Sequence, residues 1–135
     1  MPLTLSNARL RLHLDLPHEN YQRSRFDWSG KITQVFFQGI PLTAVETTAG
    51  EPGQFYGQGF YNEFGMDALP GFQEANIGDW CHKIGVGLVR KESETYLFHQ
   101  DYDIRPATFE VKAEPERCEI SCESELVNGY AYLLH

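Results

Sequence analysis

The sequence predicts an all-β protein that folds as an antiparallel β-sandwich. Alternation of apolar and polar residues recurs along the chain, and helical periodicity is nearly absent. The alternating segments are short and are joined by connections that carry Gly, Pro, Asp or Asn-Gly, which is typical of antiparallel hairpins. Because 135 residues is the length of one domain, we expect residues 1–135 to form a single β-sandwich domain.

The first half of the chain predicts three strands. Residues 10–16 place leucine at every second position between charged or polar residues, which is the pattern of a strand. Residues 31–38 are apolar on both faces, as expected of a strand that is covered on both sides. Residues 41–46 follow a glycine turn and predict the third strand.

The second half predicts an antiparallel meander, in which Phe109 and Val111 face opposite to Glu110 and Lys112. We expect its strands at residues 94–99, 107–113, 117–122 and 130–134. Between the two halves, residues 47–82 are rich in glycine and show little alternation, which predicts a long loop. The many aromatic residues in this loop argue against disorder.

Composition excludes several classes of partner. The formal net charge of -8 and the pI near 5.0 argue against nucleic acid and against an anionic membrane surface. No apolar run has the length of a membrane span. Cys118 and Cys122 lie four residues apart in a predicted strand, about 13 Å between α-carbons, which is too far for a disulfide. The simplest interpretation is reduced thiols and a cytoplasmic protein, and the alternative is an acidic secreted protein that lacks disulfides.

Three segments combine aromatic rings with paired polar groups. Residues 23–30 set two guanidinium groups, a carboxylate and two large aromatics just before a strand, and residues 60–65 and 78–87 repeat this mixture among glycines. Such a mixture suits a sugar, because bidentate groups bracket hydroxyl pairs while an aromatic ring covers the C–H face. The candidate ligand-binding residues are Arg23, Arg25, Asp27, Glu63, His82 and Lys83.

Each candidate also has a structural interpretation. Glu63 is either a group that grips a diol or a solvated acid at a strand end, and His82 is either a sugar-binding group or a hydrogen-bonded structural histidine. Lys83 shares a pocket with His82 only if both face the same way, which neighbours on a strand do not. In an extended segment, Arg23 and Arg25 would share one face.

No metal or cofactor is predicted. The histidines show no ligand spacing, and the two neighbouring cysteines of residues 118–122 lack a second pair. The sequence contains no phosphate loop, dinucleotide-binding fingerprint or serine-nucleophile motif.

In order and spacing, residues 25–32 (RFDWSGKI), 62–65 (NEFG) and 82–87 (HKIGVG) resemble the amino-terminal half of galactose mutarotase-like (aldose 1-epimerase-like) proteins. The resemblance implies a partial β-supersandwich that binds an aldose, within a protein about twice this length. It also implies cofactor-free interconversion of sugar anomers, with a His acid and a Glu base. Both come from the half that this chain lacks, so the resemblance assigns no catalytic residue here. The Asn-Arg pair of typical mutarotases is absent as such.

The resemblance therefore predicts a carbohydrate-binding protein related to aldose 1-epimerases. Two other classes stay open, a non-catalytic carbohydrate-binding sandwich and a strand-exchanging interaction domain. The last residues bear on the second of these, since the apolar pattern of residues 130–134 runs to the end of the sequence. We expect this strand to be covered either by another chain, as in a homo-oligomer, or by a segment of a longer protein.

Overall fold

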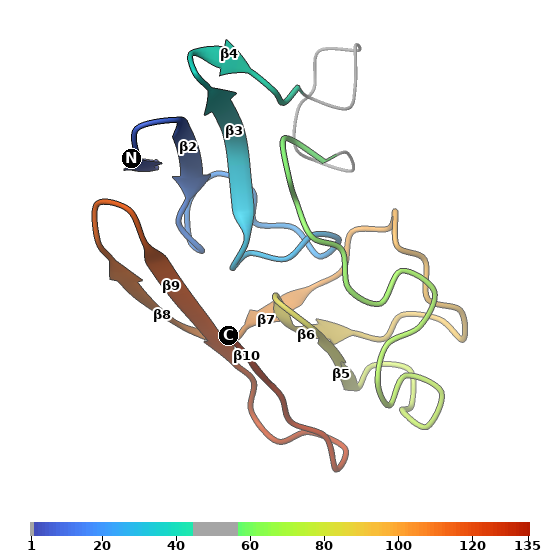
Figure 1. Ribbon diagram of the computed structural model, residues 1–135. Helices are drawn as coiled ribbons and strands as arrows, with labels where there is room; N and C mark the ends of the chain where they lie inside the picture. The colour runs from blue at the N-terminus through green and yellow to red at the C-terminus, as the bar shows by residue number, and fades with distance from the viewer. Residues whose placement is uncertain (1, 45–56) are drawn as a thin grey trace.

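A computed structural model describes residues 2–44 and 57–135 and confirms the all-β, antiparallel prediction (Figure 1). The described residues contain no helix, and accordingly none that is long and apolar enough to cross a membrane. Their strands form three antiparallel sheets with a sandwich-like arrangement. The strands are β1 (Leu3–Ser6), β2 (Leu10–Asp15), β3 (Lys31–Phe37), β4 (Ile40–Pro41), β5 (Trp80–Lys83), β6 (Gly87–Arg90), β7 (Ile104–Pro106), β8 (Thr108–Ala113), β9 (Cys118–Glu123) and β10 (Leu133–Leu134).

The first sheet has the order β1-β2-β3-β4. Its strands β2 and β3 confirm the predictions at residues 10–16 and 31–38, and a bulge between His13 and Leu14 shifts their register. The strand predicted at residues 41–46 is present only as the short β4, and its residues 45–46 lie outside the described part. Strand β1 was not predicted, although Leu3 and Leu5 already show the alternation that pairs with β2.

The other two sheets have the orders β5-β6-β7 and β10-β9-β8. Strands β8 and β9 confirm the predictions at residues 107–113 and 117–122. The strand predicted at residues 130–134 is present only as the short β10. Only Ala107 separates β7 from β8, and its N–H donates to the carbonyl of Val86 at 3.0 Å. The chain therefore passes almost directly from one sheet to the next (Figure 1).

The prediction of a strand at residues 94–99 is wrong. This segment is irregular, with bends and turns on either side of residues 96–97, although Tyr96 is buried and Leu97 is exposed, as the alternation indicated. The N–H of Leu97 donates to the hydroxyl of Tyr102 rather than to a neighbouring strand. A side chain thus satisfies the backbone group that a sheet partner would have satisfied.

The predicted long loop is confirmed for residues 57–79, which contain no strand beyond isolated bridges such as that between Phe60 and Ile32. The loop ends earlier than predicted, because β5 begins at Trp80. Residues 47–56 of the predicted loop lie outside the described residues.

Two aromatic-rich clusters form the core, and Ile104 packs against both. Trp28 is buried and stacks on Phe109, with 6.0 Å between ring centroids and 17° between ring planes. This burial agrees with the core role that is common for a tryptophan in a sandwich. The first cluster contains Leu69, Phe72, Cys81, Val89, Tyr96 and Tyr102, and the second contains Tyr21, Phe26, Trp28 and Val86.

Three of the four lysines of the chain are buried, which is unusual for this residue type. The ammonium group of Lys31 donates to the carbonyls of Pro17, Glu19 and Tyr21, and so holds the loop after β2 against β3. In the same way, Lys91 donates to the carbonyls of Phe72 and Ala75. A lysine that keeps its proton supplies three donors, so these residues satisfy loop carbonyls that lack a sheet partner.

Candidate functional site

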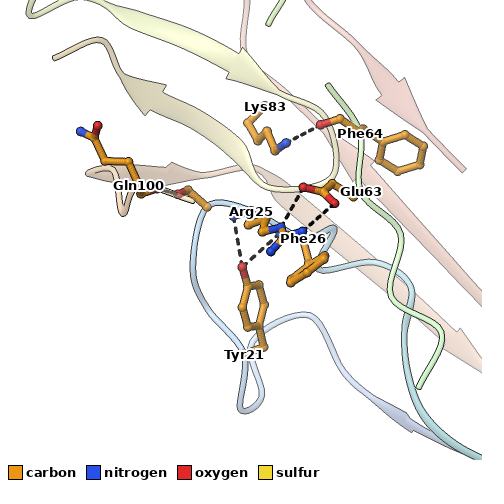
Figure 2. Close-up of polar contacts among 8 residues, drawn as sticks. Tyr21, Arg25, Phe26, Glu63, Phe64, Lys83 and Gln100 are labelled. Carbon is orange, nitrogen blue, oxygen red and sulfur yellow. Dashed lines mark hydrogen bonds and ion pairs between the residues drawn. The ribbon is translucent and has the colours of Figure 1, made fainter. Parts of the chain in front are cut away.

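An ion pair between Arg25 and Glu63 lies at the centre of the candidate site (Figure 2). Nε of Arg25 donates to Oε1 of Glu63 at 2.8 Å, and an Nη donates to Oε2 at 3.3 Å, so the contact is bidentate. The two side chains are only 16% and 15% exposed. Bidentate pairs of this kind are among the stronger hydrogen-bonded contacts in proteins, particularly when little water reaches them.

The position of Arg25 is fixed by the loop that precedes it. The hydroxyl of Tyr21 accepts the backbone N–H groups of Arg25 and Phe26, both at 3.1 Å, as Figure 2 shows. Burial is the main reason that the pKa of Tyr21 is raised to about 12, so this hydroxyl stays protonated at neutral pH. The carbonyl of Tyr21 is held in turn by Lys31.

Aromatic rings surround the guanidinium group. Its carbon atom lies 4.7 Å from the ring centroids of both Phe26 and Phe98, within the range of cation–π attraction. Tyr61 packs against Phe26 with 5.7 Å between ring centroids. The ion pair is therefore embedded in an aromatic setting.

A cavity of about 340 Å³ opens beside the ion pair. Gly59 has φ +59°, and a Cβ there would lie 2.1 Å from the carbonyl oxygen of Ile32, so only glycine fits this wall. The cavity volume is at the small end of the range for ligand pockets. Its lining consists of Arg25, Phe26, Ala44, Gly57, Gly59, Tyr61 and Glu63.

Lys83 lies close to this pair but does not line the cavity. Its ammonium group donates to the carbonyl of Phe64, the residue after Glu63, and lies 5.6 Å from the ring centroid of Tyr96. Burial lowers the pKa of Lys83 to about 8, while the charge of Glu63 opposes this shift. Lys83 thus fixes the backbone that carries Glu63 and remains protonated at neutral pH.

His82 points the other way, as alternation along β5 requires. Its Nε2 lies 2.6 Å from the carbonyl oxygen of Tyr130, so Nε2 carries the proton and donates it. Its Nδ1 is buried and has no hydrogen-bond partner in the described part of the chain. The ring contacts Tyr132 edge-on, with 5.7 Å between centroids. These contacts fit the interpretation of a structural histidine, and they bind the 127–130 turn rather than the cavity.

Arg23 and Asp27 also lie apart from the ion pair. Arg23 pairs with Asp101 at the surface, because residues 23–26 bend instead of continuing in an extended conformation. Asp27 is buried, and its Oδ1 accepts the N–H and the hydroxyl of Ser29 at 2.7 and 2.6 Å. The structure therefore brings Arg25, Glu63 and Lys83 together, and it places Arg23, Asp27 and His82 in three other environments.

Sequence reasoning missed several residues that build this site. Phe98 was assigned to a strand, and Tyr21 was not considered, because neither belongs to the three polar-aromatic segments. Tyr61 lies two residues before Glu63, within the selected segment of residues 60–65, so its place in that segment was the signal that could have identified it.

Comparison of the chain with protein-family models, with curated proteins and with solved structures finds no match.

Proposed function

We propose that this chain belongs to a carbohydrate-binding protein related to the aldose 1-epimerases, and that its ligand is a monosaccharide or a sugar derivative. The observation that supports the proposal most is the bidentate Arg25–Glu63 pair, set among aromatic rings at the wall of a small cavity. The motif resemblance of residues 25–32, 62–65 and 82–87 points to the same ligand class.

The chemistry of the cavity suits a sugar in two respects. A carboxylate offers about four lone-pair positions, and Arg25 uses two of those of Glu63, which leaves acceptor capacity for sugar hydroxyls. The ring of Tyr61, which is only partly buried, supplies apolar surface for the C–H face of a pyranose. A neutral polyol is also compatible with a site in which the charges of the protein already balance each other.

Calorimetric titration with a panel of free aldoses tests this proposal. We expect Glu63→Gln to weaken the binding of the best aldose by about tenfold or more, because a charged acceptor is replaced by a weaker neutral one. Asp101→Asn is the matched control, since it alters the other Arg–carboxylate pair of the 23–30 segment, which lies at the surface. Equal affinity of both variants and the wild type, or no binding of any aldose, would contradict the proposal.

We also propose that the catalytic acid and base are not supplied by this chain. The nearest candidates are His82 and Glu63, but the Nε2 proton of His82 is donated to a backbone carbonyl away from the cavity. Without a paired acid and base, a typical rate factor of about 10²–10⁴ is lost. Polarimetry on fresh glucose and galactose should show no acceleration of mutarotation. An acceleration proportional to protein concentration that disappears in His82→Ala would show that the catalytic groups are present.

A cytoplasmic location is part of the same proposal. All three cysteines are free, and Cys81 and Cys122 are buried among apolar groups. Burial raises the pKa of the Cys122 thiol to about 11, so this thiol is unreactive at neutral pH. Free, unreactive thiols support a reducing compartment.

A further inference from the structure

Strand β10 has a partner on one side only. It pairs with β9 through Leu133 opposite Glu123 and Leu134 opposite Cys122, and it is the outer strand of its sheet among residues 57–135. Leu133 is 70% exposed. An edge strand presents unpaired backbone groups, which is the feature that strand addition uses.

A trough of about 500 Å³ lies on the Leu134 face of this edge. It separates the first sheet from β9 and β10, and its walls are mainly apolar. The N–H of Ser6 donates to the carbonyl of Pro115 at 3.2 Å and so ties β1 to the loop between β8 and β9. The apolar side chains in the trough include Leu5, Leu12, Leu14, Ile120 and Leu134.

A second hollow, of about 310 Å³, lies on the opposite face of β10, next to Leu133. Three carboxylates and one amine line it, namely Glu110, Glu119, Glu123 and Lys112. Glu119 pairs with Arg117, whereas Glu110 and Glu123 have no ion-pair partner among the described residues. The two hollows therefore differ in character, because the trough is mainly apolar, although Asp27 and Glu119 also line it, whereas the second hollow is acidic.

We propose that the β10 edge accepts an extended strand from another polypeptide, in which apolar residues alternate with basic residues. Successive side chains of a strand point to opposite faces, so one set would enter the trough and the other would lie over the acidic hollow. The added strand would lie about 10 Å from β9, two strand spacings away, which long basic side chains can span. The proposal is independent of sugar binding, because none of these residues lines the cavity beside Arg25.

Three edge strands of a second copy fit this role poorly, and a fourth, β8, carries one glutamate for its one lysine. Strand β1 carries no charge, and β4 and β7 each contain a proline, which cannot donate to a ladder. The one segment with basic and apolar alternation, residues 9–14, is already paired on both sides as β2. The net charge of -8 also opposes self-association at an acidic edge. A partner with basic residues is thus favoured over a second copy.

A labelled synthetic octapeptide of alternating valine and lysine tests the proposal by fluorescence anisotropy at physiological salt. We expect saturable binding that weakens at least about tenfold in Leu134→Asp, which places a charge in the trough, and about two- to fivefold in Glu123→Gln. Leu126→Asp is the matched control, because Leu126 is 73% exposed and lines neither hollow, and it should leave binding unchanged. On the wild type, the peptide should slow amide exchange in β10.

Three control peptides separate strand addition from charge attraction. A scrambled peptide of the same composition, a peptide with glutamate in place of lysine, and a peptide methylated on alternate backbone nitrogens should all bind at least about tenfold more weakly. Equal binding of the scrambled peptide would overturn the proposal in favour of unspecific attraction. A stable dimer by light scattering whose formation excludes the peptide would identify a second copy as the occupant instead. No detectable binding at millimolar peptide would also overturn it.

Discussion

At the scale of single residues, two of the segments that suggested a sugar site also pack against each other. Asp27, in the first segment, approaches Gly85, in the third, so closely that a Cβ on Gly85 would lie 2.3 Å from Oδ1 of Asp27. The N–H of Trp28 donates to the carbonyl of Gly85 at 2.9 Å. Gly85 also has φ +85°, which a residue with a side chain rarely adopts. Asp27, Trp28 and Gly85 thus pack the first and third segments against each other.

We therefore expect Gly85→Ala to lower the free energy of unfolding by about 3 kcal/mol, from backbone strain and the clash together. Gly78→Ala is the matched control, since Gly78 has φ +96° but open space around its α-carbon, and it should cost about 1–2 kcal/mol. Urea unfolding of the three proteins gives both values. Equal losses in the two variants would show that the close approach of Asp27 contributes nothing.

At the scale of elements, the turn of residues 127–130 is docked on β5. Asn128 and Gly129 both have positive φ, 53° and 79°, which is the geometry that an Asn-Gly hairpin turn favours. The side-chain amide of Asn128 donates to the carbonyl of Trp80, and His82 donates to that of Tyr130. Two side-chain contacts thus hold the turn before β10.

Removal of the His82 donor should loosen this turn. We expect His82→Leu to destabilise the fold by about 1–3 kcal/mol, because it leaves the carbonyl of Tyr130 without its donor. Amide exchange should accelerate in residues 127–134, while aldose affinity should stay unchanged. His99→Leu, at an exposed position, serves as the control. A selective loss of aldose binding in His82→Leu, without faster exchange, would place His82 in the ligand site.

The sequence predicted the positions of the strands more accurately than the arrangement of the candidate site. Alternation located β2, β3, β8 and β9, because one face of each strand had to be apolar to pack. The same alternation at residues 94–99 misled, since Tyr96 and Phe98 reach the core from a turn. The residue types of Arg25 and Glu63 indicated that both belong to one site. They did not indicate that the two side chains pair with each other. This pairing depends on a loop path that is set by long-range contacts such as those of Lys31.

At the scale of the whole molecule, buried ionisable groups shape the dependence of stability on pH. Burial lowers the pKa of Lys31 and of Lys83 to about 8, below the ordinary value of 10.5. Burial raises the pKa of Tyr21 and Tyr61 to about 12 and that of Cys122 to about 11, above ordinary values of 10.0 and 9.0. The lysines on one side and the tyrosines and the cysteine on the other therefore have opposite effects on stability at alkaline pH.

The sign of each effect follows from proton linkage. Between about pH 8 and 10.5 the unfolded chain holds more lysine protons than the native state, so stability rises with pH. Above about pH 9 the unfolded chain loses thiol and phenol protons first, so stability falls. We expect maximal stability near pH 9, measured as the urea midpoint from pH 7 to 11. Lys83→Met should flatten the rise, and a steady decline from pH 7 would contradict this expectation.

The burial of Lys31, Lys83 and Lys91 also has a consequence for chemical labelling. Lys112 is the one exposed lysine of the chain, so it is the single lysine that an amine-reactive reagent can reach in the native state. Each of the other three lysines reacts only when the loop carbonyls that it holds have separated from it. The labelling rate at each site, followed by mass spectrometry, therefore reports the opening of one particular loop without any engineered probe.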